Sequence, residues 1–167
     1  MASKTDDAFD TLIRRYEQPI CSYLLRLTGD PARAQDLAQE TFLRAYQALC
    51  RGDHWENPRA WLYRVASHLA TDDFRRRRRL RWLPLSSVDG ARPAAEDIED
   101  LTAEQMAVRS ALLALSTKYR VPLVLYVCEG YSVAEVARIL GLSLSAVKMR
   151  LSRAREKFRQ FYHEEHR

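Results

Sequence analysis

The feature that most constrains the fold is an apolar periodicity of three to four residues that continues along nearly the whole chain. In the first thirty residues it is carried by Phe9, Leu12, Ile13, Tyr16, Ile20, Leu24 and Leu27. An α-helix turns once in about 3.6 residues, so this spacing puts these side chains on one helix face. No segment alternates with the period of two that is typical of a half-buried strand. The sequence therefore predicts an all-α fold.

Two cap-plus-proline pairs predict where helices begin. Asp30-Pro31 and Asn57-Pro58 each combine a good N-cap residue with proline at the first helical position. The helix after Asp30 is expected to end at Gly52. The helix after Asn57 is expected to continue into the run FRRRRRLRW, which starts at Phe74.

The charge distribution divides the chain into three parts. The segment PLSSVDGARPAAEDIED, residues 84–100, is typical of an extended linker because it holds prolines, a glycine, serines and acids. We predict two small helical domains, residues 1–82 and 102–167, joined by an acidic flexible linker over residues 83–101. The overall net charge is +5, and both predicted domains are basic. Two basic bodies favour a polyanion, above all nucleic acid, as partner.

A helix-turn-helix is predicted in the second domain. Ser132 and Glu135 match a capping box, Gly141 ends that helix, and Ser143 can cap the next one, LSAVKMRLSRAREKFRQFY. Two short helices around a glycine turn are typical of this DNA-binding motif.

The second helix of this motif has two distinct faces. At about 100° per residue, Val147, Leu151, Ala154 and Phe158 cluster on one side, which we assign to the core. The outer side carries Ser145, Lys148, Met149, Ser152, Arg153 and Glu156, and the flanks carry Arg150, Arg155 and Lys157. This arrangement suits a helix in the major groove, with basic flanks toward the phosphates. The alternative is an ordinary amphipathic helix whose outer face is basic.

The five arginines at positions 75–79 circle their helix, because four residue steps sweep about 400°. Such a segment cannot pack flat on a core. The apolar stripe of this helix, Leu62, Val65, Ala66 and Leu69, is expected to end before it. Positive charge on all sides of a helix suits binding to backbone phosphates, which carry no sequence information.

Several classes of protein are excluded. No apolar run approaches the roughly 18 residues of a membrane-spanning helix. Cys21, Cys50 and Cys128 are far apart and form no CxxC pair, which favours a reducing compartment and no zinc finger. Asp72 and Asp73 are the best metal candidates, but neighbours on a helix point about 100° apart. Without a nucleophile–base pair or a glycine-rich phosphate loop, we expect no enzyme, no cofactor and no small-molecule substrate.

Three segments carry a family resemblance. DPARAQDLAQETFLRAYQAL, NPRAWLYRVASHLATDDFRRRRR and GYSVAEVARILGLSLSAVKMRLSRAREKFR follow one another in this order. The chain resembles bacterial RNA polymerase sigma factors of the sigma-70 family, in the compact extracytoplasmic-function (ECF, group 4) type. The likeness extends from about Phe9 to Phe161. It implies a region 2 and a region 4, with no segment for regions 1 or 3.

The resemblance implies a docking role for the helix after Asp30. It would bind the clamp helices of the polymerase β′ subunit through Asp36, Leu37, Gln39, Glu40, Phe42 and Leu43. Leu37 also lies on the inward stripe and has an alternative role in the core. The β flap of the polymerase is a further implied partner.

The resemblance also implies promoter contacts. In region 2, the −10 element would be bound by the loop over residues 51–57 and the helix after it, through His54, Trp55, Asn57, Arg59, Tyr63, Ser67, Arg75 and Arg76. Trp55 would stack on an unpaired base, or alternatively anchor the loop to the core. His68 stands where many relatives have asparagine. In region 4, the −35 element would be bound through Ser145, Lys148, Met149, Arg150, Ser152 and Arg153.

The implied function is initiation of transcription at particular promoters, by binding core RNA polymerase and promoter DNA. The resemblance implies an anti-sigma factor as a further partner. The expected location is the cytoplasm, with an anti-sigma factor able to hold the chain at the inner face of the membrane. The alternative is a two-domain helix-turn-helix regulator that acts without contacting polymerase, which leaves the first 80 residues unexplained.

Overall fold

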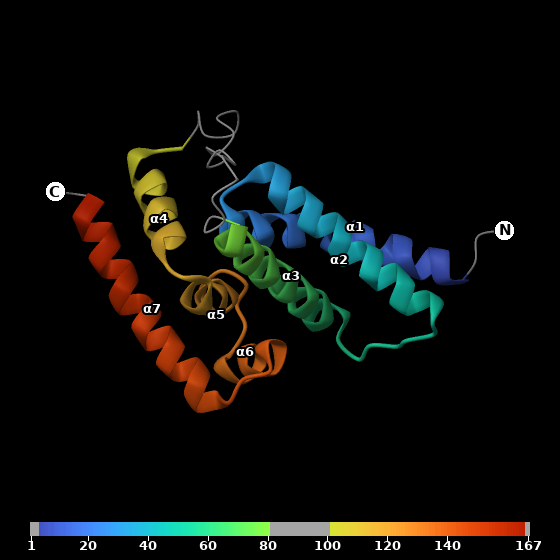
Figure 1. Ribbon diagram of the computed structural model, residues 1–167. Helices are drawn as coiled ribbons and strands as arrows, with labels where there is room; N and C mark the ends of the chain where they lie inside the picture. The colour runs from blue at the N-terminus through green and yellow to red at the C-terminus, as the bar shows by residue number, and fades with distance from the viewer. Residues whose placement is uncertain (1–3, 81–100, 166–167) are drawn as a thin grey trace.

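The computed structural model describes residues 4–80 and 101–165, and this part of the chain forms helices and no strand (Figure 1). The helices are α1 (Lys4–Thr28), α2 (Pro31–Cys50), α3 (Pro58–Leu80), α4 (Ala103–Ala114), α5 (Thr117–Val127), α6 (Val133–Leu140) and α7 (Leu144–Glu165). The all-α prediction is confirmed. The predicted linker over residues 83–101 lies, apart from Leu101, outside the described residues.

The predicted caps form as expected. The Asp30 carboxylate accepts a hydrogen bond from the Arg33 N–H at 3.2 Å, and Asn57 Oδ1 accepts one from the Ala60 N–H at 2.9 Å. At the start of α6, the Ser132 N–H donates to the Glu135 carboxylate at 2.8 Å while the Ser132 hydroxyl accepts from the Glu135 N–H at 3.3 Å. These bonds satisfy N–H groups that have no partner within their own helix.

Helices α1, α2 and α3 pack together, and α7 packs along α4, α5 and α6 (Figure 1). The α3 face inside the structure differs from the predicted stripe. Tyr63, Ser67 and Ala70 are buried together with Leu62 and Ala66, whereas the predicted Val65 and Leu69 are only partly buried. The observed buried face of α3 is wider than the predicted stripe on the side of Tyr63, because α5 and α6 pack against α3 there.

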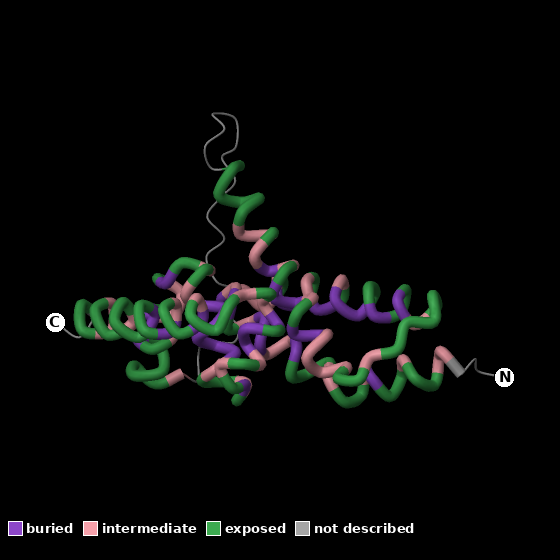
Figure 2. The backbone as a smooth tube through the Cα atoms, turned by 90° about the horizontal axis from the view of Figure 1, so that it is seen from below, coloured by how far each residue is buried: buried purple, intermediate pink, exposed green. Residues whose placement is uncertain are grey.

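The two helical units, α1–α3 and α4–α7, share one core. Buried side chains from Leu12 to Ala154 form one connected cluster, and the buried residues in Figure 2 concentrate where the units meet. At this junction Gly29 is buried with φ +70°, and a Cβ on it would lie 2.6 Å from Leu113 Cδ1 of α4. The turn between α1 and α2 thus accepts α4 at a distance that only glycine permits.

Arginines of the second unit cap the end of α1. Arg109 donates to the Gly29 carbonyl at 2.5 Å. Arg120 is 5% exposed and donates to the carbonyl oxygens of Leu27 and Leu113, and to that of Leu115 at 2.6 Å. Cations are favourable where a helix ends in free carbonyl groups, so these bonds hold the two units together.

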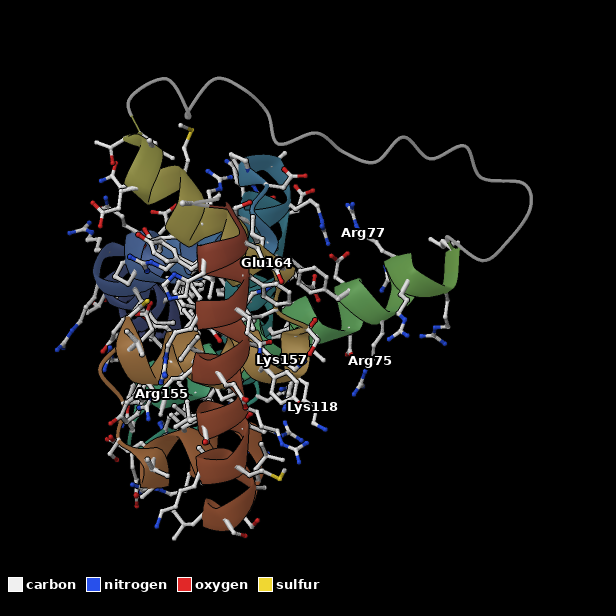
Figure 3. The ribbon with its side chains drawn as sticks, turned by 90° about the vertical axis from the view of Figure 1, so that its left-hand side faces the viewer. Arg75, Arg77, Lys118, Arg155, Lys157 and Glu164 are labelled. Atoms are coloured by element: carbon white, nitrogen blue, oxygen red, sulfur yellow. The ribbon has the colours of Figure 1, made fainter. Side chains whose placement is uncertain are left out.

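The arginine segment, residues 75–80, projects from the body. Figure 2 shows the end of α3 leaving the packed helices, and Figure 3 shows Arg75 and Arg77 on it. The packed part of α3 continues beyond the apolar stripe. Asp73 forms an ion pair with Arg33, and the guanidinium groups of Arg33 and Arg120 lie over the ring of Phe74. All residues from 75 to 80 are exposed.

Candidate nucleic-acid interface

The helix-turn-helix is formed by α6, α7 and the turn between them. Gly141 adopts the left-handed conformation, φ +63°, and its N–H bonds to the Ala137 carbonyl. Ser143 Oγ then accepts from the Ala146 N–H at 3.2 Å at the start of α7. Both features predicted from the sequence are confirmed, and together they fix the direction in which α7 leaves the turn.

The faces of α7 lie as the residue spacing predicts. Val147, Leu151 and Ala154 are buried, and Phe158 is half-buried against the core. The exposed outer residues are Ser145, Lys148, Met149, Ser152, Arg153 and Glu156, and Arg150 is half-buried. Figure 3 shows Arg155 and Lys157 on this helix. An exposed polar face between basic flanks has the chemistry needed to contact base edges and phosphates of a duplex.

Arg153 also contacts its own protein. Its hydrogen bond to the Tyr119 hydroxyl, with Lys118 and Lys157 nearby, lowers the pKa of that tyrosine. Arg155 lies over the ring of Tyr126, 5.3 Å from its centre. Two aromatic rings of α5 therefore hold basic side chains of α7 in place. The residue spacing within α7 alone does not predict these contacts.

The loop over residues 51–57 presents only part of the aromatic surface predicted for it. Trp55 stacks on Trp61, with ring centres 4.3 Å apart and planes 24° from parallel, and both rings are half-buried. One face of Trp55 is thus already used within the protein. His54 is exposed, and the Asn57 side chain is occupied as the cap of α3.

Two residues predicted to face −10 DNA are buried in this conformation. Tyr63 and Ser67 are each 1% exposed. Ser67 shares a 2.7 Å hydrogen bond with the Tyr23 hydroxyl, and it also donates to the Tyr63 carbonyl at 2.5 Å. The packed arrangement therefore does not present Ser67 or the Tyr63 ring to DNA, because α1 lies against one side of them and the second unit covers the other. Arg75 and Arg76 are exposed as predicted.

Glu129 occupies the covered face of α3. It follows α5, and the left-handed Gly130 turns the chain directly after it. One carboxylate oxygen accepts from Tyr63 Oη at 2.5 Å and the other from Arg26 Nη1 at 3.0 Å. The Glu129 side chain is only 8% exposed. Sequence reasoning did not single this residue out, since an acid after a helix is usually a solvated one.

Arg59 completes this cluster. Its Nη2 donates to the Glu129 carbonyl at 2.8 Å, and its guanidinium lies over the Tyr131 ring at 4.4 Å. Burial, and then the hydrogen bond to Glu129, raises the pKa of Tyr63, so its hydroxyl keeps its proton and remains a donor. Burial likewise raises the pKa of Tyr131 to about 12.

The predicted docking residues of α2 divide into three groups by burial. Asp36, Gln39 and Leu43 are exposed, and 49% of the surface of Leu43 is accessible to solvent. Leu37 and Glu40 are half-buried. Phe42 is 7% exposed and belongs to the core, so its ring is not a free docking surface here. Phe42 lies one residue after Thr41, and both are on the face of α2 that packs inward.

The acidic pair on α3 is used in ion pairs. Asp72 pairs with Arg75 at 3.7 Å, and Asp73 pairs with Arg33. Over the described ranges there is no group of three or more histidine, cysteine or acidic side chains placed to hold a metal ion. Among the helices of the described residues, none is both long and apolar enough to cross a membrane.

Two family models match separate parts of the chain. Residues 12–80 match the family model Sigma-70 region 2, and residues 105–158 match Sigma-70, region 4. The chain is 33% identical over 156 residues to RNA polymerase sigma factor YlaC of Bacillus subtilis, covering 91% of this chain and 90% of that protein. It is 36% identical to ECF RNA polymerase sigma factor SigL of Mycobacterium tuberculosis, covering 77% and 74%.

A solved structure shows the same fold with a related sequence. CnrH, in complex with the cytosolic domain of CnrY, superposes with a TM-score of 0.64 at 30% identity, covering 92% of this chain and 86% of that chain.

The chain therefore belongs to the sigma-70 family of RNA polymerase sigma factors. Within that family it is of the ECF type, with a region 2 and a region 4. It is a factor that binds core RNA polymerase and directs initiation at specific promoters. The alternative, a regulator that acts without contacting polymerase, is not favoured. The family matches include residues 12–80 as well as the helix-turn-helix.

Proposed function

We propose that α7 binds the −35 element of the promoter in the major groove, through Ser145, Lys148, Met149, Arg150, Ser152 and Arg153. The observation that carries this assignment is the exposed outer face of α7 behind a capped turn. Met149 is 44% exposed and offers no hydrogen bond, so contact with a thymine methyl group is its natural use.

Region 2 supplies the remaining roles. The −10 element is assigned to the loop over residues 51–57 and to α3, with Arg75 and Arg76 as phosphate contacts. Leu43, beside Gln39 and Asp36, is the centre of the surface for the β′ clamp helices, because it is a large exposed apolar residue among polar ones. The proposed divisions are residues 1–82, 83–101 and 102–167, and the two family matches lie within the first and the last.

An anti-sigma factor is the proposed regulatory partner. The relative CnrH is solved with the cytosolic domain of another protein, CnrY, and it resembles this chain over nearly its whole length. A partner of that kind would hold this chain in the cytoplasm, or at the inner face of the membrane. Region 4 would in addition contact the β flap when the chain joins polymerase.

The test is run-off transcription with purified core enzyme on a library of promoter fragments. Lys148→Ala should reduce initiation selectively at promoters with an intact −35 element, because a good base contact contributes about 1–3 kcal/mol. Arg159→Ala is the matched control, since Arg159 is an exposed cation of α7 outside the proposed contact set. Equal loss on intact and scrambled −35 DNA would make Lys148 a backbone contact.

A further inference from the structure

The five arginines of the projecting segment do not have equal surroundings. Arg75 pairs with Asp72, and Arg77 pairs with Asp73, each at 3.7 Å. The other three form no ion pair with any residue that the structure describes, and they are Arg76, Arg78 and Arg79. Positive charge alone therefore does not decide which of the five are free to bind a phosphate.

The two ion pairs differ in how far water reaches them. The side chains of Arg75 and Asp72 are 71% and 66% exposed, and such an exposed pair contributes little and can exchange for another anion. The Asp73 side chain is 23% exposed and also pairs with Arg33, which is 14% exposed. Figure 3 shows Arg75 and Arg77 pointing to opposite sides of the end of α3. Arg77 thus belongs to a partly buried group of two cations around one carboxylate.

Arg33 is held in its position by an aromatic ring. Its guanidinium lies over the ring of Phe74, 5.4 Å from the centre. Burial, and then the nearby charge of Arg77, lowers the pKa of Arg33 to about 10, so Arg33 remains charged at neutral pH. Two neighbouring cations repel each other unless the carboxylate paired with both of them carries its charge. Asp73 therefore determines whether Arg77 stays beside Arg33.

This group of three joins two helices to which the proposed function gives different partners. Arg33 lies in the first turn of α2, the helix proposed to dock on polymerase, whereas Asp73 and Arg77 lie on α3. The ion pair between the helices holds the start of the arginine segment in a fixed direction relative to the docking helix. An arginine used for this purpose is not available to a phosphate.

We propose that Asp73 is a positioning residue for nucleic-acid binding, because it holds Arg77 against Arg33 and leaves phosphate binding to the other arginines of the segment. The assignment rests on the proposed function, in which this segment binds phosphates, and it deepens that function by dividing the five cations into two roles. The phosphate contacts are then Arg75, Arg76, Arg78 and Arg79.

The experiment measures how salt affects binding of the full-length chain to a fluorescent single-stranded DNA of twelve nucleotides and mixed sequence. A single strand is used because it offers no major groove to α7. Each lost phosphate contact should reduce the steepness of log K against log salt by about 0.7. Arg79→Gln should show this reduction. Arg77→Gln makes the same chemical change two positions earlier and should leave the steepness unchanged. Equal reductions in the two variants would overturn the proposal and leave the whole segment as a phosphate-binding element.

Removing the charge of Asp73 gives the converse test. Asp73→Asn should release Arg77 and increase the steepness by about 0.7, and the addition of Arg77→Gln should abolish this gain. Asp72→Asn is the matched control, because it neutralises the neighbouring carboxylate, which pairs with one exposed arginine. A gain that survives Arg77→Gln, or an equal gain in Asp72→Asn, would contradict the proposal, since the gain would then reflect net charge.

Helical circular dichroism of each variant shows which comparison applies. Arg77 and Arg79 are exposed, so their glutamine variants should keep the fold. If Asp73→Asn unfolds the chain, the comparison of these two variants still decides. A salt dependence that neither variant changes would refute the positioning role together with the phosphate role of the segment. The −35 assignment would be untouched, because transcription with Lys148→Ala tests it separately.

Discussion

Replacing Arg120 by methionine tests whether the two helical units form one cooperative structure. Methionine retains an apolar stem of similar length and removes the guanidinium. Three carbonyl oxygens then lose their donor, those of Leu27 in region 2 and of Leu113 and Leu115 in region 4. The substitution therefore weakens both the fold of region 4 and its contact with the end of α1.

The expected size follows from two opposing effects. A buried acceptor left without a donor costs about 1–3 kcal/mol, and three are left here. Burying the guanidinium itself costs several kcal/mol, and that cost disappears with the charge. We expect a net loss of about 2–4 kcal/mol in the free energy of unfolding.

Urea unfolding followed by helical circular dichroism measures this loss. With a slope of about 2 kcal/mol per molar urea, the midpoint should fall by about 1–2 M. Arg109→Met is the control, because Arg109 donates to one carbonyl, that of Gly29, and should cost about 1 kcal/mol. An Arg120→Met chain as stable as the Arg109→Met chain would refute the reasoning, since it would mean that the three bonds only offset the cost of burying the charge.

Two further substitutions separate docking from folding. Leu43→Asp should weaken binding to core polymerase at least about tenfold in gel-filtration or fluorescence titrations, without a change in thermal stability, because Leu43 is 49% exposed. Val127→Asp, at 62% exposure, is the matched control, and equal weakening by both would place the docking surface elsewhere. Ser132→Ala should cost about 1 kcal/mol by removing the cap of α6 and lower the melting temperature by about 2–4 °C. An unchanged melting temperature would show that the Glu135 half of the box is enough.

Local signals predicted the helices well. Asp30, Asn57 and Ser132 begin helices because their side chains bond N–H groups within three residues, a range that the sequence displays directly. The outer face of α7 was also predictable, since the 3.6-residue period alone separates Lys148 from Val147.

The junction between the two units was not predictable in this way. Tyr63 and Ser67 lie beside the apolar stripe that the spacing within α3 shows, and they are buried because α1 packs on one side of them and α5 and α6 pack on the other. Glu129 has no local signal, as its partners are 66 or more residues away in the sequence. Contacts at such separations depend on tertiary packing, which periodicity within one helix does not encode.

Arg120 did carry a signal. It lies in TKYRVPLVLYV, where it and the residues after it through Leu125 are all buried. A charged residue inside such an apolar run is rarely buried without partners. The sequence could therefore have predicted a buried, multiply bonded arginine, although not that one of its partners is the end of α1.

The projecting arginine segment has a consequence for local folding. Residues 75–80 are all exposed, so burial contributes little to the stability of this end of α3, and the helix there depends on its backbone hydrogen bonds. Five neighbouring cations oppose that helix by mutual repulsion, which is offset by their place at its C-terminal end and by the ion pairs of Arg75 with Asp72 and of Arg77 with Asp73. A polyanion that neutralises them removes the repulsion and so stabilises the helix to which it binds. Formation of helix at residues 75–80 and binding of nucleic acid to them are therefore coupled. Amide hydrogen exchange in this segment should become slower when a phosphate backbone is bound.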